Sequence, residues 1–144
     1  MKYYSLNNKT KTISFQEAVI QGLAPDNGLY FPETITPLST SFFDEIENLS
    51  NEEIAFEVIK QFVGNEIPDA ELKNIINETL CFDFPLVSVE ENIYSLELFH
   101  GPTMAFKDVG ARFMSRCLGY FNKNNDKQVT VLVATSGDTG GAVA

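Results

Sequence analysis

The sequence has little of the side-chain chemistry that many enzymes use, and each scarcity excludes something. It has two cysteines, one histidine and no apolar run long enough to cross a membrane. Cys81 and Cys117 form no Cys-x-x-Cys pair, so we expect two buried thiols without a function. His100 has no companion residues for a zinc site or a catalytic triad. We therefore predict no metal, and a loop histidine that bonds to backbone or lines a binding crevice.

Basic residues are also scarce. The chain carries 10 lysines and arginines against 20 acids, and between residues 33 and 97 only Lys60 and Lys73 are basic. An acidic surface repels phosphate backbones, which excludes nucleic acid as a partner. From residue 98 onward bases outnumber acids, so this part can attract a small anion. The five bases are Lys107, Arg112, Arg116, Lys123 and Lys127, and the three acids are Asp108, Asp126 and Asp138. The N-terminus lacks the apolar core of a secretory signal, which indicates a cytoplasmic protein outside the membrane.

The N-terminal part has clear start and stop signals. With 144 residues, the chain suits one domain or parts of two. Capping boxes at Ser14 and Ser50 predict helices over 14–21 and 50–63 that stop at Gly22 and Gly64. Short strands are expected over 2–6 and 11–13, a turn over 24–28 with positive φ available at Asn27-Gly28, an extended segment over 29–32, and helices over 42–47 and 68–80. The apolar face of the helix over 50–63 is predicted to consist of Ile54, Ala55, Val58, Ile59 and Phe62. That of the helix over 68–80 is predicted to consist of Leu72, Ile75, Ile76 and Leu80.

After Pro85 strand and helix patterns alternate. Residues 93–99 read as a strand, 108–121 as a helix and 129–134 as a buried strand, which together predict a βαβ unit. The inward face of the helix is expected to hold Val109, Phe113, Met114, Cys117, Leu118 and Phe121. The fold class is therefore α/β, with a mostly helical N-terminal region and a short β-hairpin, followed by the start of a parallel-sheet domain.

Lys107 lies where the strand over 93–99 leads through a Gly-Pro turn into the next helix. It follows Met104, Ala105 and Phe106, an apolar wall that lowers the pKa of an amine it buries. Such an amine suits Schiff-base chemistry, although a lysine at a helix start is more often ordinary.

A glycine-rich loop follows the second predicted strand. The loop consists of Ser136, Gly137, Asp138, Thr139 and Gly140. Its unpaired amides and hydroxyls can bind a carboxylate or phosphate, but a tight turn without a ligand fits equally well. The spacing matches neither Walker A nor the dinucleotide fingerprint. Two loops that follow strands of one parallel unit lie at the same sheet edge, so Lys107 and this loop are predicted to face one crevice.

Four sequence segments are specific as a set: Leu-Glu-Leu-Phe-His-Gly-Pro-Thr at 96–103, Ala-Phe-Lys-Asp at 105–108, Ala-Thr-Ser-Gly-Asp-Thr-Gly at 134–140, and Gln-Gly-Leu-Ala-Pro-Asp-Asn-Gly-Leu-Tyr-Phe-Pro at 21–32. Together they resemble the threonine synthase family, pyridoxal-phosphate enzymes of the tryptophan-synthase-β class. The resemblance implies a threonine-synthase-like N-terminal domain over 1–83, followed over 84–144 by the truncated start of a three-layer, fold type II catalytic domain. The parts that hold the cofactor phosphate would lie beyond residue 144.

The resemblance also implies the chemistry. Lys107 matches the catalytic lysine that forms the internal aldimine with pyridoxal 5'-phosphate. Asp138 matches a position beside the cofactor, and the loop from Ser136 through Gly137, Asp138 and Thr139 to Gly140 matches the loop that takes the substrate's α-carboxylate. The implied reaction, that of a carbon–oxygen lyase acting on phosphates, converts O-phospho-L-homoserine and water to L-threonine and phosphate.

Two other functions stay open. A serine or threonine dehydratase of the same class would carry the same lysine and a similar loop, although residues 21–32 and Asp138 argue against it. A non-catalytic domain would keep the fold without the chemistry. We further expect the 144 residues to be a fragment that is inactive by itself.

Overall fold

The computed structural model describes residues 1–124 and 129–144. It divides into two compact units, Met1–Asn77 and Glu78–Ala144. Asp126 and Lys127, which count toward the predicted charge of the C-terminal part, lie outside the described residues. Within the described ranges, no helix combines the length and apolarity that a membrane span requires.

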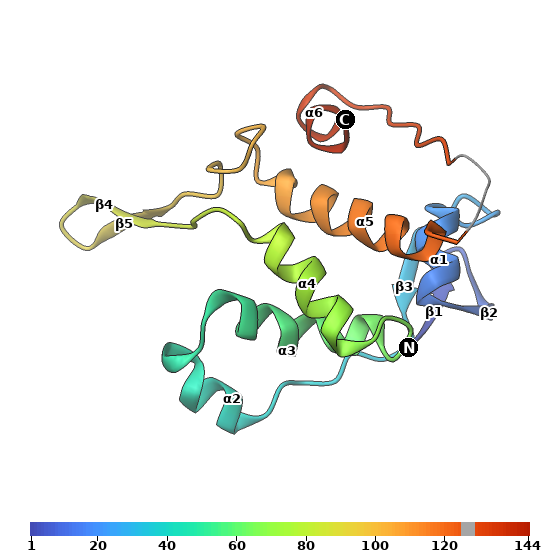
Figure 1. Cartoon of the computed structure of the whole chain (residues 1–144), viewed down its shortest axis with the longest axis horizontal. Helices are drawn as coiled ribbons and strands as arrows, with labels where there is room; N and C mark the ends of the chain where they lie inside the picture. Colours follow the sequence, from blue (N-terminus) through green and yellow to red (C-terminus); the bar gives the residue numbers. More distant parts are fainter. Residues whose placement is uncertain (125–128) are drawn as a thin grey trace. The chain divides into compact units, whose positions relative to one another are not determined.

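The first unit opens with a small antiparallel sheet (Figure 1). Its strands are β1 (Lys2–Ser5), β2 (Asn8–Ser14) and β3 (Tyr30–Pro32), in the order β2-β1-β3. Tyr3 pairs with Ile13 on one side, and Tyr4 pairs with Phe31 on the other. The predicted hairpin and the extended return over 29–32 are confirmed.

The turn before β3 is held by Asp26. One carboxylate oxygen accepts the Ser5 hydroxyl at 2.6 Å and the Gly28 amide at 2.9 Å. Asn27 takes the positive φ of +62°, whereas Gly28 does not. Gly28 is required for a different reason, because a Cβ there would lie 2.0 Å from the Ser5 hydroxyl oxygen.

The helices of the first unit lie where local signals predict, although the helix expected over 42–47 begins at Thr40 and ends at Glu45. They are α1 (Phe15–Gln21), α2 (Thr40–Glu45), the 3-10 turn η1 (Ile46–Asn48), α3 (Asn51–Val63) and α4 (Asp69–Thr79), whose last two residues belong to the second unit. Both capping boxes form, at Ser14 with Glu17 and at Ser50 with Glu53. Gly22 and Gly64 end α1 and α3 with φ near +68° and +67°, which other residues adopt at a cost.

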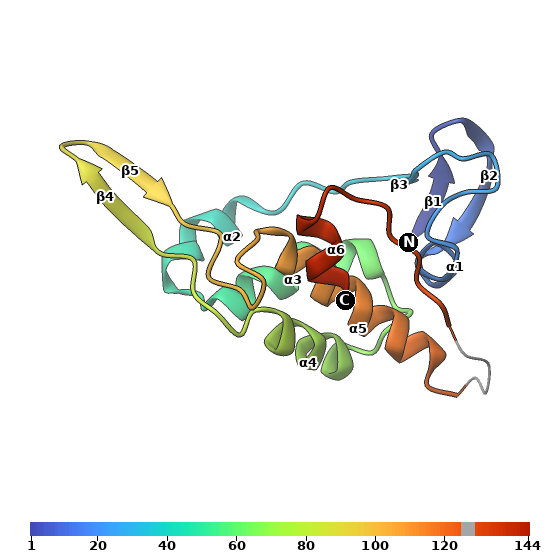
Figure 2. The ribbon, with the colours of Figure 1, turned by 90° about the horizontal axis from the view of Figure 1, so that it is seen from above.

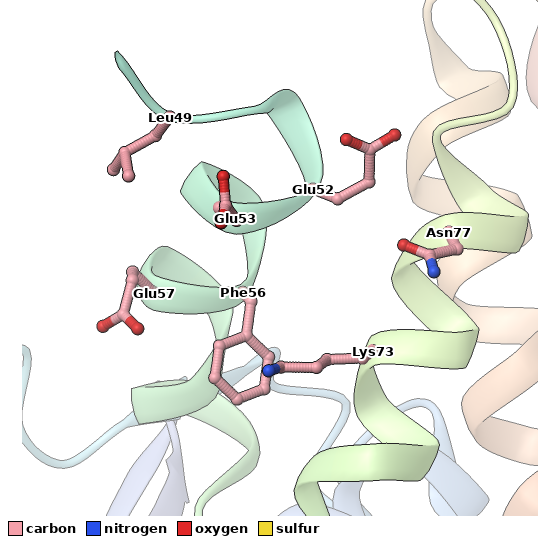
Figure 3. Close-up of a pocket in the computed structure, with 7 residues that line it drawn as sticks. All are labelled: Leu49, Glu52, Glu53, Phe56, Glu57, Lys73 and Asn77. Atoms are coloured by element: carbon pink, nitrogen blue, oxygen red, sulfur yellow. The ribbon is translucent and has the colours of Figure 1, made fainter. Parts of the chain in front are cut away.

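The apolar core of the first unit draws on the sheet, α1 and the pair of helices α3 and α4, which run side by side (Figures 1 and 3). Val63, Ile67 and Leu72 are completely buried. The predicted α4 stripe is confirmed at Leu72, Ile75 and Ile76. The predicted α3 face is wrong in detail. Phe56 and Val63, seven residues apart and thus on one helix face, are buried, whereas Val58 is 37% exposed.

The second unit contains a hairpin and two helices. Strands β4 (Leu86–Glu90) and β5 (Ile93–Leu96) pair antiparallel, with Leu86 opposite Leu96. The hairpin projects away from helices α5 (Lys107–Asn122) and α6 (Asp138–Val143) in both views, and α6 packs beside α5 (Figures 1 and 2). The predicted helix over 108–121 is confirmed.

The βαβ unit is not formed in the described residues. β5 has an antiparallel partner, and residues 129–134 are extended chain without strand pairing. Leu132 is 90% exposed, so the segment is not buried either. A parallel strand exists only through hydrogen bonds to a neighbouring strand, and no described strand lies beside this segment.

The two cysteines differ from each other. Cys117 is completely buried on α5, as predicted, whereas Cys81 is exposed. The Cys81 sulfur accepts a hydrogen bond from Arg112 Nη2 at 3.1 Å. Of the predicted α5 face, only Cys117 is fully enclosed, and Met114 is 44% exposed. An apolar helical periodicity thus identifies a face but not the amount of cover that the face receives.

Candidate functional site

Lys107 is the first residue of α5. The residue before it, Phe106, occupies the N-cap position in a helical conformation and offers no side-chain cap. The Lys107 amine lies 4.8 Å from the centre of the Phe106 ring, a cation–π contact. No salt bridge joins Lys107 to a carboxylate in the described parts of the chain. The amine therefore contacts an aromatic ring and has no salt-bridge partner among the described residues.

The predicted apolar wall around Lys107 does not enclose it. Met104 and Phe106 are 78% and 61% exposed, and Lys107 itself is only half-buried. The three apolar residues precede the helix in a loop, and their sequence gives no information about whether another element covers them. The amine is reachable from solvent in this unit.

Asp108, the next residue, was not identified from the sequence as a residue of the candidate site. Its side chain is 1% exposed, and its two oxygens accept the Thr103 hydroxyl at 2.6 Å and the Thr103 amide at 3.0 Å. Burial by itself raises the pKa of this carboxyl, but the hydrogen bonds from Thr103 and Ala105 and the charge of Arg112 outweigh it, so the pKa falls below its usual value. The sequence signal for this pair is the Thr-x-x-x-x-Asp spacing, with Thr103 before Lys107 and Asp108 directly after it.

His100 has a side-chain partner. Its Nε2 lies 2.7 Å from Glu97 Oε2, and its ring stacks on Phe99 with centroids 4.9 Å apart. The expected bond to backbone is replaced by this carboxylate contact, because Glu97 lies only three residues away.

The glycine-rich loop leads into α6, which begins at Asp138. Ser136, Gly137 and Asp138 are exposed, and Thr139 and Gly140 are partly buried. Gly137 has φ of +139°, a conformation that favours glycine. The loop therefore presents Ser136 and Asp138 to solvent, whereas Thr139 is partly covered.

Thr135 organises this loop and was also missed from the sequence. Its hydroxyl oxygen accepts the Gly137 amide at 2.8 Å and the Gly140 amide at 3.1 Å. A Cβ at Gly140 would lie 3.3 Å from that oxygen, which is a tight contact. Two amides thus converge on one oxygen, the arrangement by which loops hold carboxylate and phosphate oxygens.

Helices α5 and α6 pack beside each other, which brings the two predicted loops into one unit (Figure 2). No hydrogen bond or ion pair joins Lys107 to the loop within the residues that the structure describes. The predicted crevice between them stays a prediction.

The first unit holds an open pocket of about 390 Å³ between α3 and α4 (Figure 3). Three of its seven lining residues are glutamates, and the Lys73 amine lies over the Phe56 ring at 4.8 Å from the ring centre. The lining residues are Leu49, Glu52, Glu53, Phe56, Glu57, Lys73 and Asn77. None of the predicted site residues lines this pocket.

Comparison with known proteins gives close relatives. The threonine synthase of Escherichia coli K12 is 42% identical over 144 residues, which covers 100% of this chain and 33% of that protein. The threonine synthase of Saccharomyces cerevisiae is 43% identical and covers 94% of this chain and 30% of that protein. The chain thus spans about a third of the length of these curated relatives.

Solved structures agree with the sequence matches. The crystal structure of threonine synthase from Escherichia coli superposes with a TM-score of 0.93, covering 100% of this chain and 33% of that chain. A threonine synthase from Brucella melitensis with bound pyridoxal phosphate has a TM-score of 0.89 at 37% identity, covering 99% of this chain and 32% of that chain.

The family model for the N terminus of threonine synthase matches residues 2–80. This range includes the small sheet, both capping boxes and the α3–α4 core. Since the match covers more than half of the chain, the chain belongs to the threonine synthase family and corresponds to its N-terminal region.

Proposed function

We propose that this chain is the N-terminal part of a threonine synthase, which uses pyridoxal 5'-phosphate to convert O-phospho-L-homoserine and water to L-threonine and phosphate. The observation that carries the proposal is the coverage of the whole chain, Lys107 and the glycine-rich loop included, by threonine synthases at about 40% identity. A likeness that covered only the first unit would leave the chemistry unsupported.

The proposed domains are 1–83, a threonine-synthase-like N-terminal domain, and 84–144, the start of a three-layer parallel-sheet domain. Exposed apolar residues in the second unit support the latter. Leu86 and Val89 of the hairpin are each 65% exposed, and Leu132 is 90% exposed. Apolar surface of this extent is normally covered. The further two thirds of the relatives' length would supply that cover.

Lys107 is proposed to hold the cofactor covalently through its amine. The fit is chemical: the amine is primary, reachable and without an acidic partner among the described residues. The cofactor, when bound, supplies the electron sink for carbanion chemistry next to the substrate's amino group. Once released from the cofactor, the Lys107 amine would take and return protons at the substrate's α and neighbouring carbons.

The glycine-rich loop is proposed to bind the substrate's α-carboxylate. The amides of Gly137 and Gly140 already converge on the Thr135 hydroxyl, and an arriving carboxylate oxygen would replace that hydroxyl. The Ser136 and Thr139 hydroxyls would add donors. Asp138, exposed at the start of α6, is proposed to lie beside the cofactor.

The test uses the complete protein that carries this chain. Phosphate release from O-phospho-L-homoserine should exceed 2-oxobutanoate release from threonine, and Lys107→Ala should lower it by about 10²–10⁴-fold. Lys123→Ala, at the other end of α5, is the matched control and should keep the activity. If 2-oxobutanoate from threonine is the main product, the protein is a dehydratase and the proposal fails.

The 144 residues alone are proposed to be inactive. Added pyridoxal phosphate should give no stable absorbance at about 410–420 nm, the usual range for its lysine adducts. A stable band that disappears in Lys107→Ala would contradict this.

A further inference from the structure

We infer that Asp108 is a positioning residue that fixes the loop of residues 101–107. It thereby sets the direction in which the Lys107 side chain points from the start of α5. The inference rests on the proposed function, in which that amine holds the cofactor. It assigns a role to a residue beside the lysine rather than to the lysine itself.

The burial of Asp108 requires an explanation. It is 1% exposed and is the only charged residue that is buried in the described part of the chain. An unpaired buried carboxylate is strongly unfavourable, so such a group persists where its hydrogen bonds are needed. Apolar packing does not account for it, because nearby Met104 and Phe106 are exposed.

Both oxygens of Asp108 bind the loop that precedes the lysine. Oδ1 accepts the Thr103 hydroxyl at 2.6 Å, and Oδ2 accepts the Thr103 amide at 3.0 Å. Gly101 packs directly on the carboxylate, since a Cβ there would lie 2.3 Å from Oδ2. The loop therefore closes around a single side chain.

The loop does not hold its shape by local preference alone. Met104 has φ of +56°, a left-handed conformation that is uncommon for a residue with a side chain of this size. Two turn bonds, from the Met104 amide to Gly101 O and from the Asp108 amide to Ala105 O, each at 3.0 Å, run on either side of it. The Asp108–Thr103 bonds join these turns across the strained residue.

Lys107 depends on this arrangement because α5 has no conventional cap. Phe106 provides no side-chain hydrogen bond at the N-cap, yet its ring lies 4.8 Å from the Lys107 amine. Release of the Thr103–Asp108 bonds would free residues 103–106, the ring included. The amine would then sample directions that do not lead to the cofactor, which slows covalent attachment without removing any reacting group.

The experiment compares four single-residue variants in the complete protein. Thr103→Val removes the hydroxyl that Asp108 binds, and Thr103→Ser restores it. Gly101→Ala places a methyl group against the carboxylate, and Gly110→Ala is its control, because a Cβ there meets nothing within 4 Å. Two readouts are used: hydrogen exchange at the Thr103 amide without cofactor, and the rate of borohydride-fixed attachment of pyridoxal phosphate to Lys107.

The expected result is a rise of about tenfold in Thr103 amide exchange and a similar fall in attachment rate for Thr103→Val and Gly101→Ala. Thr103→Ser and Gly110→Ala should resemble the wild type. With saturating cofactor, kcat should fall while KM for O-phospho-L-homoserine changes little.

The outcomes separate the two claims. If the wild type attaches pyridoxal phosphate at Lys107 and both disruptive variants do so at the same rate, the positioning role is overturned. If the wild type shows no attachment at Lys107, the proposed function fails, and the positioning role fails with it. The exchange measurement needs no cofactor and by itself reports whether Asp108 holds the loop.

Discussion

Glu66 offers a sharp test of how the first unit is held together. Its two carboxylate oxygens accept the amides of Phe15 at 3.0 Å and Gln16 at 2.8 Å, the first residues of α1, from about fifty residues away. Helix N-termini have unpaired amides and a partial positive charge, so a carboxylate there is doubly favoured. Replacing Glu66 should therefore weaken the link between α1 and the chain that joins α3 to α4.

The magnitude follows from the two bonds. Hydrogen bonds to charged groups contribute about 1.5–3 kcal/mol each, and less where water can replace the partner. Glu66→Gln keeps one acceptor, which can serve the partly buried Phe15 amide, while water satisfies the exposed Gln16 amide. We expect a loss of about 1–2 kcal/mol in the free energy of unfolding, and about 3 kcal/mol for Glu66→Ala.

The assay is urea unfolding followed by circular dichroism and tyrosine fluorescence, since the chain has five tyrosines and no tryptophan. With a slope of about 1–2 kcal/mol per molar urea, Glu66→Gln should lower the midpoint by about 1 M. Glu33→Gln makes the same change of charge at an exposed site and should have little effect.

The pKa of Tyr3 provides an independent test of the role of Glu66. Burial, and secondly the charge of Glu66, raise the pKa of Tyr3 to about 12. Glu66→Gln should lower the pKa of Tyr3, which ultraviolet titration measures against a Tyr3→Phe variant. A midpoint equal to that of Glu33→Gln, together with an unchanged Tyr3 titration, would refute the reasoning about Glu66.

Three further predictions concern the rest of the chain. Leu72→Ala, at a fully buried position of α4, should lower the free energy of unfolding by about 2–5 kcal/mol, measured by urea unfolding; a loss below about 1 kcal/mol would contradict the described core. Exposed Cys81 should react quickly with a thiol reagent at pH 8, whereas Cys117, whose burial raises its pKa to about 12, should react only on unfolding; Cys81→Ser should abolish the fast phase. Because the pKa of Asp108 is lowered in the folded state, its carboxylate stabilises the fold above the unfolded pKa of about 3.9 and loses this effect as pH falls further, so Asp108→Asn should flatten the loss of stability below about pH 4; a variant curve parallel to the wild type would disprove this.

Local structure in the first unit could be predicted from the sequence because the interactions that cause it join residues only a few positions apart. The capping boxes at Ser14 and Ser50 bond across three residues, and Gly22 and Gly64 end helices through their own backbone freedom. The candidate site residues could be predicted for a different reason, because the sequence around Lys107 and Ser136 resembles that of threonine synthases. The sequence thus determined the boundaries of the two helices with capping boxes, the family and the candidate residues.

Tertiary structure decided what covers each element and what holds each site residue. The Glu66 carboxylate binds the start of α1 from about fifty positions away in the sequence. β5 pairs with an antiparallel strand where a parallel one was expected, and Cys81 is exposed rather than buried. At the candidate site, the supports are Asp108 under the lysine loop and Thr135 under the glycine-rich loop. A pattern along the chain fixes which groups are available, but burial and hydrogen-bond partners depend on distances through space, which only the folded chain sets.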